Sequence, residues 1–324
     1  MLKGLFFIIL LSACLLSCQK EFNPFESEQT RTDSTVTNDT IKAVVFEGPI
    51  GHGAPNDYYD SIVYTITATQ TTISHYERSR ILEYEEFIKY DNQQRVVSYH
   101  NEWNGTYRYC FYTYTGSGKI PTSLVDSTDD SDFFYSKFTQ LSSAPYAGGM
   151  MHTFRYEHYG NSNPPEIDTT IVYFDNNGNF KKSRTLAGLS YSEGTTHYNS
   201  SGLVDSIISL SVSPAYTEKD SLWIKYTPHT NPLNQLSTLI FKNLAKYSCA
   251  GLYAPYAGYL TFHFFLDGIT EAKFPSNTGF NSGNNIGDTY EYTPQLVNGA
   301  VKSVVIKYTD PYTGQSSSGM MRIY

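Results

Sequence analysis

Cysteine is scarce in this 324-residue chain, which contains only 4. Cys14 and Cys18 lie near the N-terminus, so only Cys110 and Cys249 remain for the body of the protein. That number excludes both a multi-cysteine zinc site and a disulfide-rich scaffold. The remaining two could form one disulfide in an oxidising compartment. We favour two separate small core residues, because a sequence does not show whether two cysteines lie close together.

Basic residues, long apolar runs and catalytic signatures are also few. Lys and Arg number 23 against 31 Asp and Glu, and an acidic chain is a poor candidate for binding nucleic acid. Beyond the N-terminus no run approaches the ~20 apolar residues of a membrane-spanning helix. The chain has no Gly-x-Ser-x-Gly elbow, no His-Glu-x-x-His and no catalytic cysteine context. We therefore predict no catalytic residue, no metal ligand and no cofactor.

The N-terminus has the layout of a secretory signal peptide. Lys3 is a short positive region, and residues 4–16 form an apolar stretch too short to cross a bilayer. The stretch ends in "LLSC" (residues 15–18), which resembles a bacterial lipobox. There a small residue precedes the cleaved bond and the following thiol receives diacylglycerol. We predict removal of residues 1–17 and lipidation of Cys18; a plain signal peptide with an incidental cysteine is the alternative.

The residues after Cys18 suggest where the protein goes. Residues 19–21, "QKE", resemble the export tags of Bacteroidota-type surface lipoproteins. Residues 18–42 are rich in Ser, Thr, Asp and Glu, and we predict that they form a flexible tether. More than one acyl chain on an N-terminal cysteine suffices for stable attachment. The expected location is the outer membrane, lipid-anchored at the cell surface, with its periplasmic face as the alternative.

From about Val44 onward, alternation of side-chain type predicts strands. In "YLTFHFFL" (259–266) and "VKSVVIKY" (301–308) the apolar residues recur at every second position. Aromatic residues make up 15% of the chain, with 29 Tyr against 2 Trp, a composition that suits sheets. Both features favour an all-β domain over residues 43–324.

A short motif recurs along this domain: an aromatic residue, a polar turn, and an aliphatic residue that begins the return strand. The first four copies begin at Tyr90, Tyr114, Phe174 and Tyr198, with two of the spacings equal to 24 residues. Looser copies begin at Tyr226 and Tyr292. We expect Gly118, Gly178 and Gly202 to supply positive φ. Gln94 replaces the glycine in the first copy, so that turn is expected to differ slightly.

Sequential hairpins favour an up-and-down meander. About 280 residues at roughly 12–16 per strand and turn give on the order of 16–20 strands, and so large a sheet curls, splits or closes. We predict a large antiparallel meander that is strongly rolled or barrel-like. A two-sheet sandwich and a true outer-membrane barrel are the alternatives.

One short helical insert is expected near residues 231–246. Asn231 can cap it, and Pro232 suits the first helical position. Apolar residues then recur at three- and four-residue steps: Leu233, Leu236, Ile240 and Leu244. We expect this helix to cover one end of the sheet as a plug or lid.

These hairpins resemble the tyrosine- and aspartate-containing (YD/RHS-like) repeats of bacterial surface and toxin-shell proteins. They are closer still to a family of Bacteroidota-type lipoproteins of unknown function, whose β-domain is described as porin-like. "TNPLNQL" (230–236) resembles the insert that those lipoproteins carry between strands. The resemblance implies the architecture of residues 55–324 and implies no activity.

Several polar groups could carry chemistry, and each has a simpler explanation. His152 and His158 are six residues apart, about 20 Å along a strand, so solvent-facing histidines are favoured over a metal site. Asp126 opens an acidic loop that lacks the glycine and closing glutamate of a Ca²⁺ hand; its other members are Asp129, Asp130 and Asp132. The glycine-rich loop at His52 precedes no helix pattern, so it is not a phosphate cradle.

The favoured function is a non-catalytic surface module that binds a glycan or a protein through exposed aromatic residues. The first candidates for that contact are Trp103, Tyr253, Tyr256 and Tyr259. A hydrolase of extracellular glycans using carboxylates such as Glu85 or Glu86 is the alternative, because the fold could bring such groups together. A purely structural envelope protein is a third possibility.

Overall fold

A computed structural model of the chain describes residues 41–48, 59–77, 81–103, 106–128, 135–159, 166–242, 271–282 and 285–324. This part holds 18 strands and the helix α2 (Pro232–Phe241). The strands are β1 (Ala43–Glu47), β2 (Tyr59–Ile66), β3 (Gln70–Glu77), β4 (Leu82–Tyr90), β5 (Val96–Trp103), β6 (Thr106–Thr113), β7 (Ser123–Thr128), β8 (Tyr135–Tyr146), β9 (Gly149–Tyr159), β10 (Glu166–Asp175), β11 (Phe180–Ala187), β12 (Ser190–Tyr198), β13 (Val204–Val212), β14 (Thr217–Thr230), β15 (Lys273–Ser282), β16 (Asn285–Val297), β17 (Ala300–Thr309) and β18 (Ser316–Ile323).

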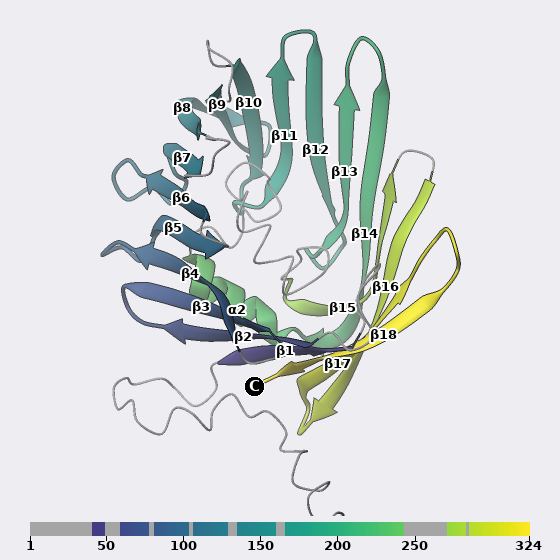
Figure 1. The fold of residues 1–324 in the computed structure, drawn as a ribbon. Coiled ribbons are helices and arrows are strands. Elements are labelled where there is room, and N and C mark those ends of the chain that lie inside the picture. Colours follow the sequence, from purple (N-terminus) through teal and green to yellow (C-terminus); the bar gives the residue numbers. More distant parts are fainter. Residues whose placement is uncertain are drawn as a thin grey trace, which may run out of the picture. The chain divides into compact units, whose positions relative to one another are not determined.

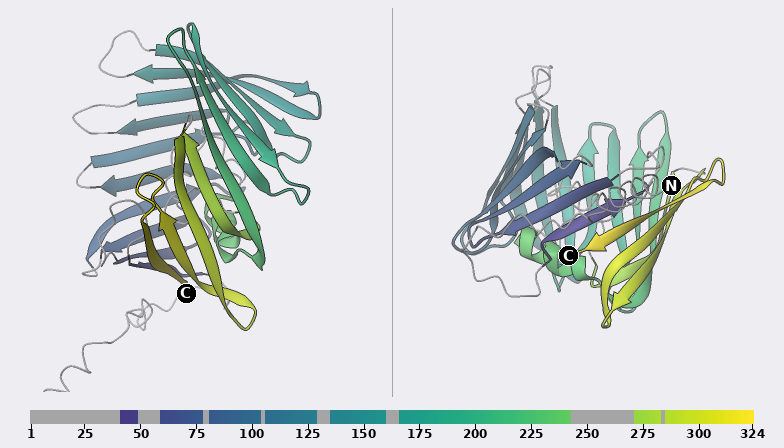
Figure 2. Two further views of the ribbon diagram at one scale, coloured as in Figure 1. Left: turned by 90° about the vertical axis from the view of Figure 1, so that its right-hand side faces the viewer. Right: turned by 60° about the horizontal axis from the view of Figure 1, so that its bottom comes forward.

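The strands form one closed antiparallel barrel (Figure 1, Figure 2). Each strand pairs with the next one in the chain, and β1 also pairs with β18, with Val44 opposite Ile323. The predicted all-β meander is therefore confirmed in its closed form, and 18 strands lie within the expected range. The two-sheet sandwich is wrong, because the β1–β18 pairing leaves no free sheet edge among the described strands.

Successive connections alternate between the two ends of the barrel. The connections that follow β2, β4, β6, β8, β10, β12 and β16 share one end with α2, which follows β14. We call this the plug end and the opposite one the distal end. The four tighter copies of the motif begin within one residue of the end of an even-numbered strand, so their turns gather at the plug end.

Three of the repeated turns have the same hydrogen bonds. The residue after the aromatic accepts, through its side-chain oxygen, backbone amides two and four residues later. Its own amide donates to the carbonyl four residues later. The residues in this role are Asp91, Asp175 and Asn199. The turn chemistry read from the sequence is thus present in the fold.

Two details of the predicted turns are wrong. Gln94 does not alter its turn: it adopts φ 59°, close to the 73° of Gly178 and 76° of Gly202. Its side-chain amide also donates to the Ala68 carbonyl at 3.0 Å. This hydrogen bond helps to stabilise Gln94 in the left-handed backbone conformation, which is usually adopted by glycine. In the second copy the positive φ belongs to Gly116 (56°), because the longer turn there bends two residues before Gly118.

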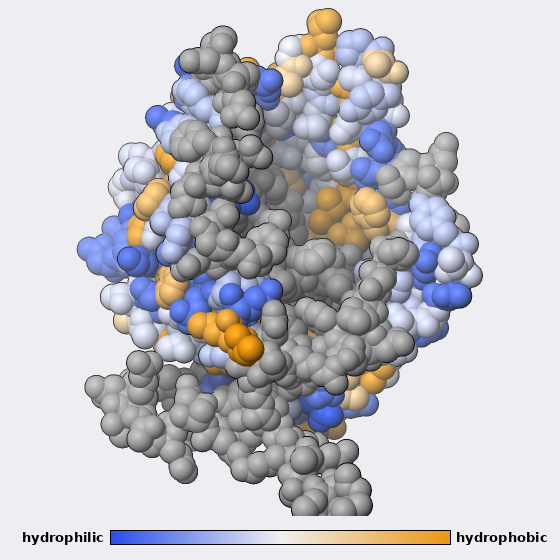
Figure 3. Space-filling view, viewed as in Figure 1, coloured by the Kyte–Doolittle hydropathy of each residue, from blue (hydrophilic) through white to orange (hydrophobic). Residues whose placement is uncertain are grey.

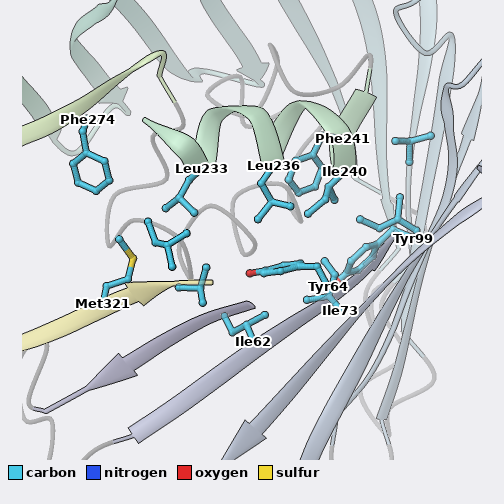
Figure 4. Packing of buried hydrophobic residues seen from close by; sticks show 14 of the residues in the cluster. Ile62, Tyr64, Ile73, Tyr99, Leu233, Leu236, Ile240, Phe241, Phe274 and Met321 are labelled. Atoms are coloured by element: carbon cyan, nitrogen blue, oxygen red, sulfur yellow. The ribbon is translucent and has the colours of Figure 1, made fainter. Parts of the chain in front are cut away.

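Helix α2 lies inside the barrel and fills its plug end (Figure 4). The Asn231 side chain accepts the Leu233 amide at 3.0 Å, and Pro232 takes the first helical position, as predicted. Leu233, Leu236 and Ile240 are at most 1% exposed and belong to the same apolar cluster as wall residues of β1–β6 and β15–β18. The helix ends at Phe241, and residues 243–246 of the predicted insert lie outside the described part. Within that part no helix is long and apolar enough to cross a bilayer.

Several predictions fall on residues outside the described ranges. These are the signal peptide (1–17), Cys18 and the tether to residue 40, the strand at 259–266, and Cys249. They remain predictions. Cys110 is a free, fully buried thiol on β6.

Candidate functional site on the inner wall

The two faces of the barrel wall can be assigned from α2. The Tyr90 hydroxyl donates to the Ile240 carbonyl at 2.7 Å, so Tyr90 and every second residue of β4 face inward. The cross-strand register carries that assignment around the ring. Residues that alternate with these form the outer wall.

The outer wall is charged. Four ion pairs lie on it, on strands spread around the ring: Arg155–Glu157 (2.7 Å), Lys182–Glu193 (2.7 Å), Lys307–Glu291 (3.5 Å) and Arg322–Glu47 (3.1 Å). On the face shown in Figure 3, the coloured residues are mostly blue and white, with orange in separate patches. Aromatic side chains also lie on this face, where Phe87, His100 and Tyr109 stack. Ion pairs therefore lie on the outer wall, while the apolar cluster that packs on α2 lies inside.

The inner wall changes character along the barrel axis. Near the plug end it is apolar and packs on α2. Further toward the distal end, a band of polar side chains crosses β3 to β10. We call it the inner polar band; its described members are His75, Glu86, Tyr99, Arg108, Cys110, Asp126, Ser136, Tyr156, Asp168 and Thr170.

The carboxylate of Glu86 is the central hydrogen-bonding group of the inner polar band on β3 to β5. Glu86 Oε1 lies 2.8 Å from His75 Nε2, and Glu86 Oε2 accepts the Tyr99 hydroxyl at 2.7 Å. His75 and Glu86 are 1% and 2% exposed. The His75 ring stacks on Tyr84 at 4.0 Å. Burial and then the charge of Glu86 raise the pKa of Tyr99 well above its usual value, so its hydroxyl stays a donor.

A second carboxylate organises the next strands. Arg108 holds Asp126 with two hydrogen bonds, from Nε to Oδ1 at 3.2 Å and from Nη2 to Oδ2 at 3.0 Å. Burial raises the pKa of Asp126 to about 6, although Arg108 and a hydrogen bond from Cys110 act in the opposite direction. Burial, followed by the charge of Asp126, also raises the pKa of the Cys110 thiol well above its usual value. This thiol is therefore neutral and unreactive at neutral pH.

His152 does not face solvent, so that prediction is wrong. It is 7% exposed and lies beside the Phe174 ring at 5.6 Å. Its Nδ1 lies 2.8 Å from Ser143 Oγ and 2.9 Å from Gln140 Nε2. The bulge in β8 between Gln140 and Ser142 brings both groups onto one histidine. Burial lowers the pKa of His152, which favours its neutral form.

The remaining predicted site residues are dispersed. Glu85 and Glu86 point to opposite faces: Glu85 accepts a hydrogen bond from Ser74 on the outer wall, and Glu86 lies in the inner polar band. The backbone of His158 pairs with Glu166, and Trp103 ends β5. Other candidates lie outside the described residues: His52, Asp129, Asp130, Asp132, Tyr253, Tyr256 and Tyr259.

Sequence reasoning missed His75, Tyr99 and Arg108. Their partners lie 11, 13 and 18 residues away and meet them only through the strand register. The sequence feature that could have identified them is a polar residue at a strand position where the alternation predicts an inward-facing side chain. Among the residues that the structure describes, no group of three or more His, Cys, Asp or Glu side chains is arranged to hold a metal ion. The band offers hydroxyls, a guanidinium and carboxylates, which are groups that hydrogen-bond a polar ligand.

Neither a protein-family model nor a curated protein matches the chain. Solved structures are similar to it, among them two porin-like proteins. A porin-like protein from Bacteroides uniformis has 11% identity and a TM-score of 0.42, over 89% of this chain and 97% of that one. A porin-like protein from Bacteroides vulgatus has 9% identity and a TM-score of 0.34, over 89% of this chain and 98% of that one. At these identities and TM-scores the likeness supports no statement about ligand or location.

Proposed function

We propose that this chain is a lipid-anchored, extracytoplasmic protein whose barrel stands in water at the cell surface and serves as a non-catalytic binding or structural module. The charged outer wall carries this proposal. An Arg or Lys facing lipid at the bilayer midplane costs about 2–4 kcal/mol. Ion pairs on strands around the ring, such as Lys182–Glu193 and Lys307–Glu291, therefore favour water outside the barrel. Attachment then falls to the lipobox cysteine, Cys18.

The inner polar band is the surface we propose for ligand contact. Arg108 has a side chain 27% exposed, and Tyr84, Tyr156 and Asp168 are partly exposed. Aromatic rings beside hydrogen-bonding groups suit a sugar or a polar peptide. The hydrolase alternative is less favoured, because a catalytic carboxylate must reach its substrate. Glu86 and Asp126 are each 2% exposed and already hydrogen-bonded.

Anchoring is tested by replacing the lipidated thiol. With Cys18→Ser, we expect loss of incorporated fatty acid by mass spectrometry and release of the protein from membranes without detergent. Cys14→Ser is the matched control, since that cysteine lies inside the apolar leader and should leave both properties unchanged. A Cys18→Ser protein that still needs detergent to leave the membrane would show that the barrel wall itself is inserted.

Ligand contact is tested with the released protein on glycan and peptide arrays. Retention without product supports a binding module, and product formation supports the hydrolase. Arg108→Ala is the informative variant, because its guanidinium is the most exposed charge in the Arg108–Asp126 pair. Loss of retention in this variant would locate the ligand on the inner polar band. Unchanged retention would place the ligand elsewhere.

A further inference from the structure

Among the residues that the structure describes, the two ends of the barrel carry opposite charge. Counting the plug-end turns, α2 with its flanking residues, and the three nearest residues of each strand, the described chain has ten basic residues there: Lys42, Lys89, Arg95, Lys119, Lys181, Lys182, Lys242, Lys273, Lys302 and Arg322. The same region has four acidic residues: Asp91, Asp175, Asp205 and Glu271. This region is therefore basic although the whole chain has a net charge of −8.

At the distal end, defined by the same rule, acidic residues outnumber basic ones among the described residues. Its described acidic side chains are Glu47, Glu83, Asp126, Glu157, Glu166, Asp168, Glu218 and Asp310. Its basic residues are Arg108, Lys137, Lys219 and Lys307. Such a distribution gives the barrel an electric dipole along its axis.

Three ion pairs of the described residues involve this end: Arg95 pairs with Asp91, while Lys182 and Arg322 pair with glutamates outside the plug end. Seven lysines and three acids of the plug end lie outside these three pairs. Five of the lysines are exposed on different parts of the ring: Lys42, Lys89, Lys119, Lys181 and Lys302. Exposed apolar side chains occur at both ends, for example Val297 and Leu189, so they do not distinguish the ends.

The chain also enters the barrel at the basic end. The Lys42 amide donates to the Tyr324 carbonyl at 2.8 Å, and the Tyr324 amide donates to the Ala43 carbonyl at 3.0 Å. The segment before Lys42 is therefore attached where the lysines are. A surface held at that end meets a positive face, and the acidic end points away from it.

We propose that the plug end docks on an anionic lipid surface, which orients the barrel with its distal end toward the surroundings. This inference rests on the proposed anchoring, because the anchor brings the barrel to a membrane. The attraction is electrostatic and peripheral, and salt weakens it, since charges more than about 10 Å apart are screened at 0.1 M ionic strength. The inner polar band, displaced toward the distal end, would then lie on the side that faces incoming ligand.

The test uses the full mature chain carrying Cys18→Ser, so that its outcome does not depend on lipidation. Sedimentation is measured with vesicles of phosphatidylcholine alone and with added phosphatidylglycerol, at 20 mM and 150 mM salt. We expect roughly tenfold stronger binding to the anionic vesicles at low salt. Lys119→Glu, Lys181→Glu and Lys302→Glu together should reduce that binding by about tenfold.

The matched control is a triple variant that reverses the same number of charges at positions outside the plug end. Its substitutions are Lys137→Glu, Lys219→Glu and Lys225→Glu. Each triple includes one lysine that lies over an aromatic ring, Lys181 over Tyr198 and Lys225 over Trp223, so loss of such a contact is balanced. The matched triple should bind within about twofold of the parent. Equal losses in both triples, no preference for anionic vesicles, or stronger binding to soluble heparin than to vesicles would overturn the proposal. If a glutamate triple fails to fold by circular dichroism, glutamine replaces glutamate in both.

Discussion

Replacing Asp126 with Asn should stabilise the barrel at neutral pH, although it removes an ion pair. Burial raises the pKa of Asp126 from 3.8 to about 6, even with Arg108 beside it. One pKa unit corresponds to about 1.4 kcal/mol, so ionised Asp126 disfavours folding by about 3 kcal/mol. Asn has the shape of protonated Asp and no charge to bury. Arg108 loses the charge of this carboxylate, but its side chain is 27% exposed and can be hydrated.

The sign of the pH dependence follows from the raised pKa. Below about pH 4, Asp126 is protonated in both the folded and the unfolded chain, so Asp126→Asn should leave the free energy of unfolding nearly unchanged. Between about pH 4 and 6 the unfolded carboxyl ionises first, and the parent protein loses stability relative to the variant. At pH 7.5 the difference should reach about 3 kcal/mol in favour of the variant. Urea unfolding followed by circular dichroism at several pH values measures it.

Asp175→Asn is the control with the opposite slope. Burial acts to raise the pKa of Asp175, but hydrogen bonds from Asn179 and Asn177 and the charge of Lys181 outweigh it and lower the pKa. Asp175 therefore stabilises the fold above its unfolded pKa, and this contribution is lost as pH falls. Asn199 shows that Asn can close the same turn. If Asp126→Asn lowered stability at pH 7.5, the ion pair would outweigh the burial cost and the reasoning would be refuted.

Four further substitutions test the plug end by urea unfolding. Gln94→Gly should stabilise by about 0.5–1 kcal/mol by relieving a left-handed Gln, and Gly178→Gln should cost about 1 kcal/mol; a loss for both would mean that the Gln94 hydrogen bond dominates. Tyr90→Phe should cost about 1–2 kcal/mol, because the buried Ile240 carbonyl loses its donor. Ile240→Ala should cost about 2–5 kcal/mol, since that side chain is 0% exposed, and a near-zero cost would mean that α2 does not fill the core.

Local features of the fold were predictable from the sequence. The turns at Asp175 and Asn199 and the cap at Asn231 depend on groups within four residues of each other, so residue type and spacing suffice. Strand alternation reports burial on one face, which is also local. Even so, the prediction that Gln94 would alter its turn was wrong. The Ala68 carbonyl that accepts the hydrogen bond from the Gln94 side chain belongs to the preceding hairpin, so the local sequence does not reveal it.

Closure and the inner polar band were not predictable in detail. Closing the ring requires β1 to pair with β18 at the far end of the chain, and hairpin patterns are the same in open and closed sheets. The His75–Glu86 contact depends on the register of β3 against β4, which shifts by a bulge at His75 and Tyr76. A slip of one residue would turn Glu86 to the outer wall and Glu85 inward.

The repeated aromatic explains why the two ends of the barrel can differ so much. In three copies the tyrosine hydroxyl donates to the first residue of the previous hairpin's return strand: Tyr114 to Val96, Tyr198 to Phe180, and Tyr226 to Val204, at 2.6–2.7 Å. Each hairpin is thereby tied to its predecessor at the plug end, where the apolar core and α2 also lie. We infer that these hydrogen bonds and the apolar core let the inner wall beyond them carry buried carboxylates such as Glu86 and Asp126. The repeat that first marks the sequence as modular is thus also the feature that joins neighbouring hairpins at the plug end.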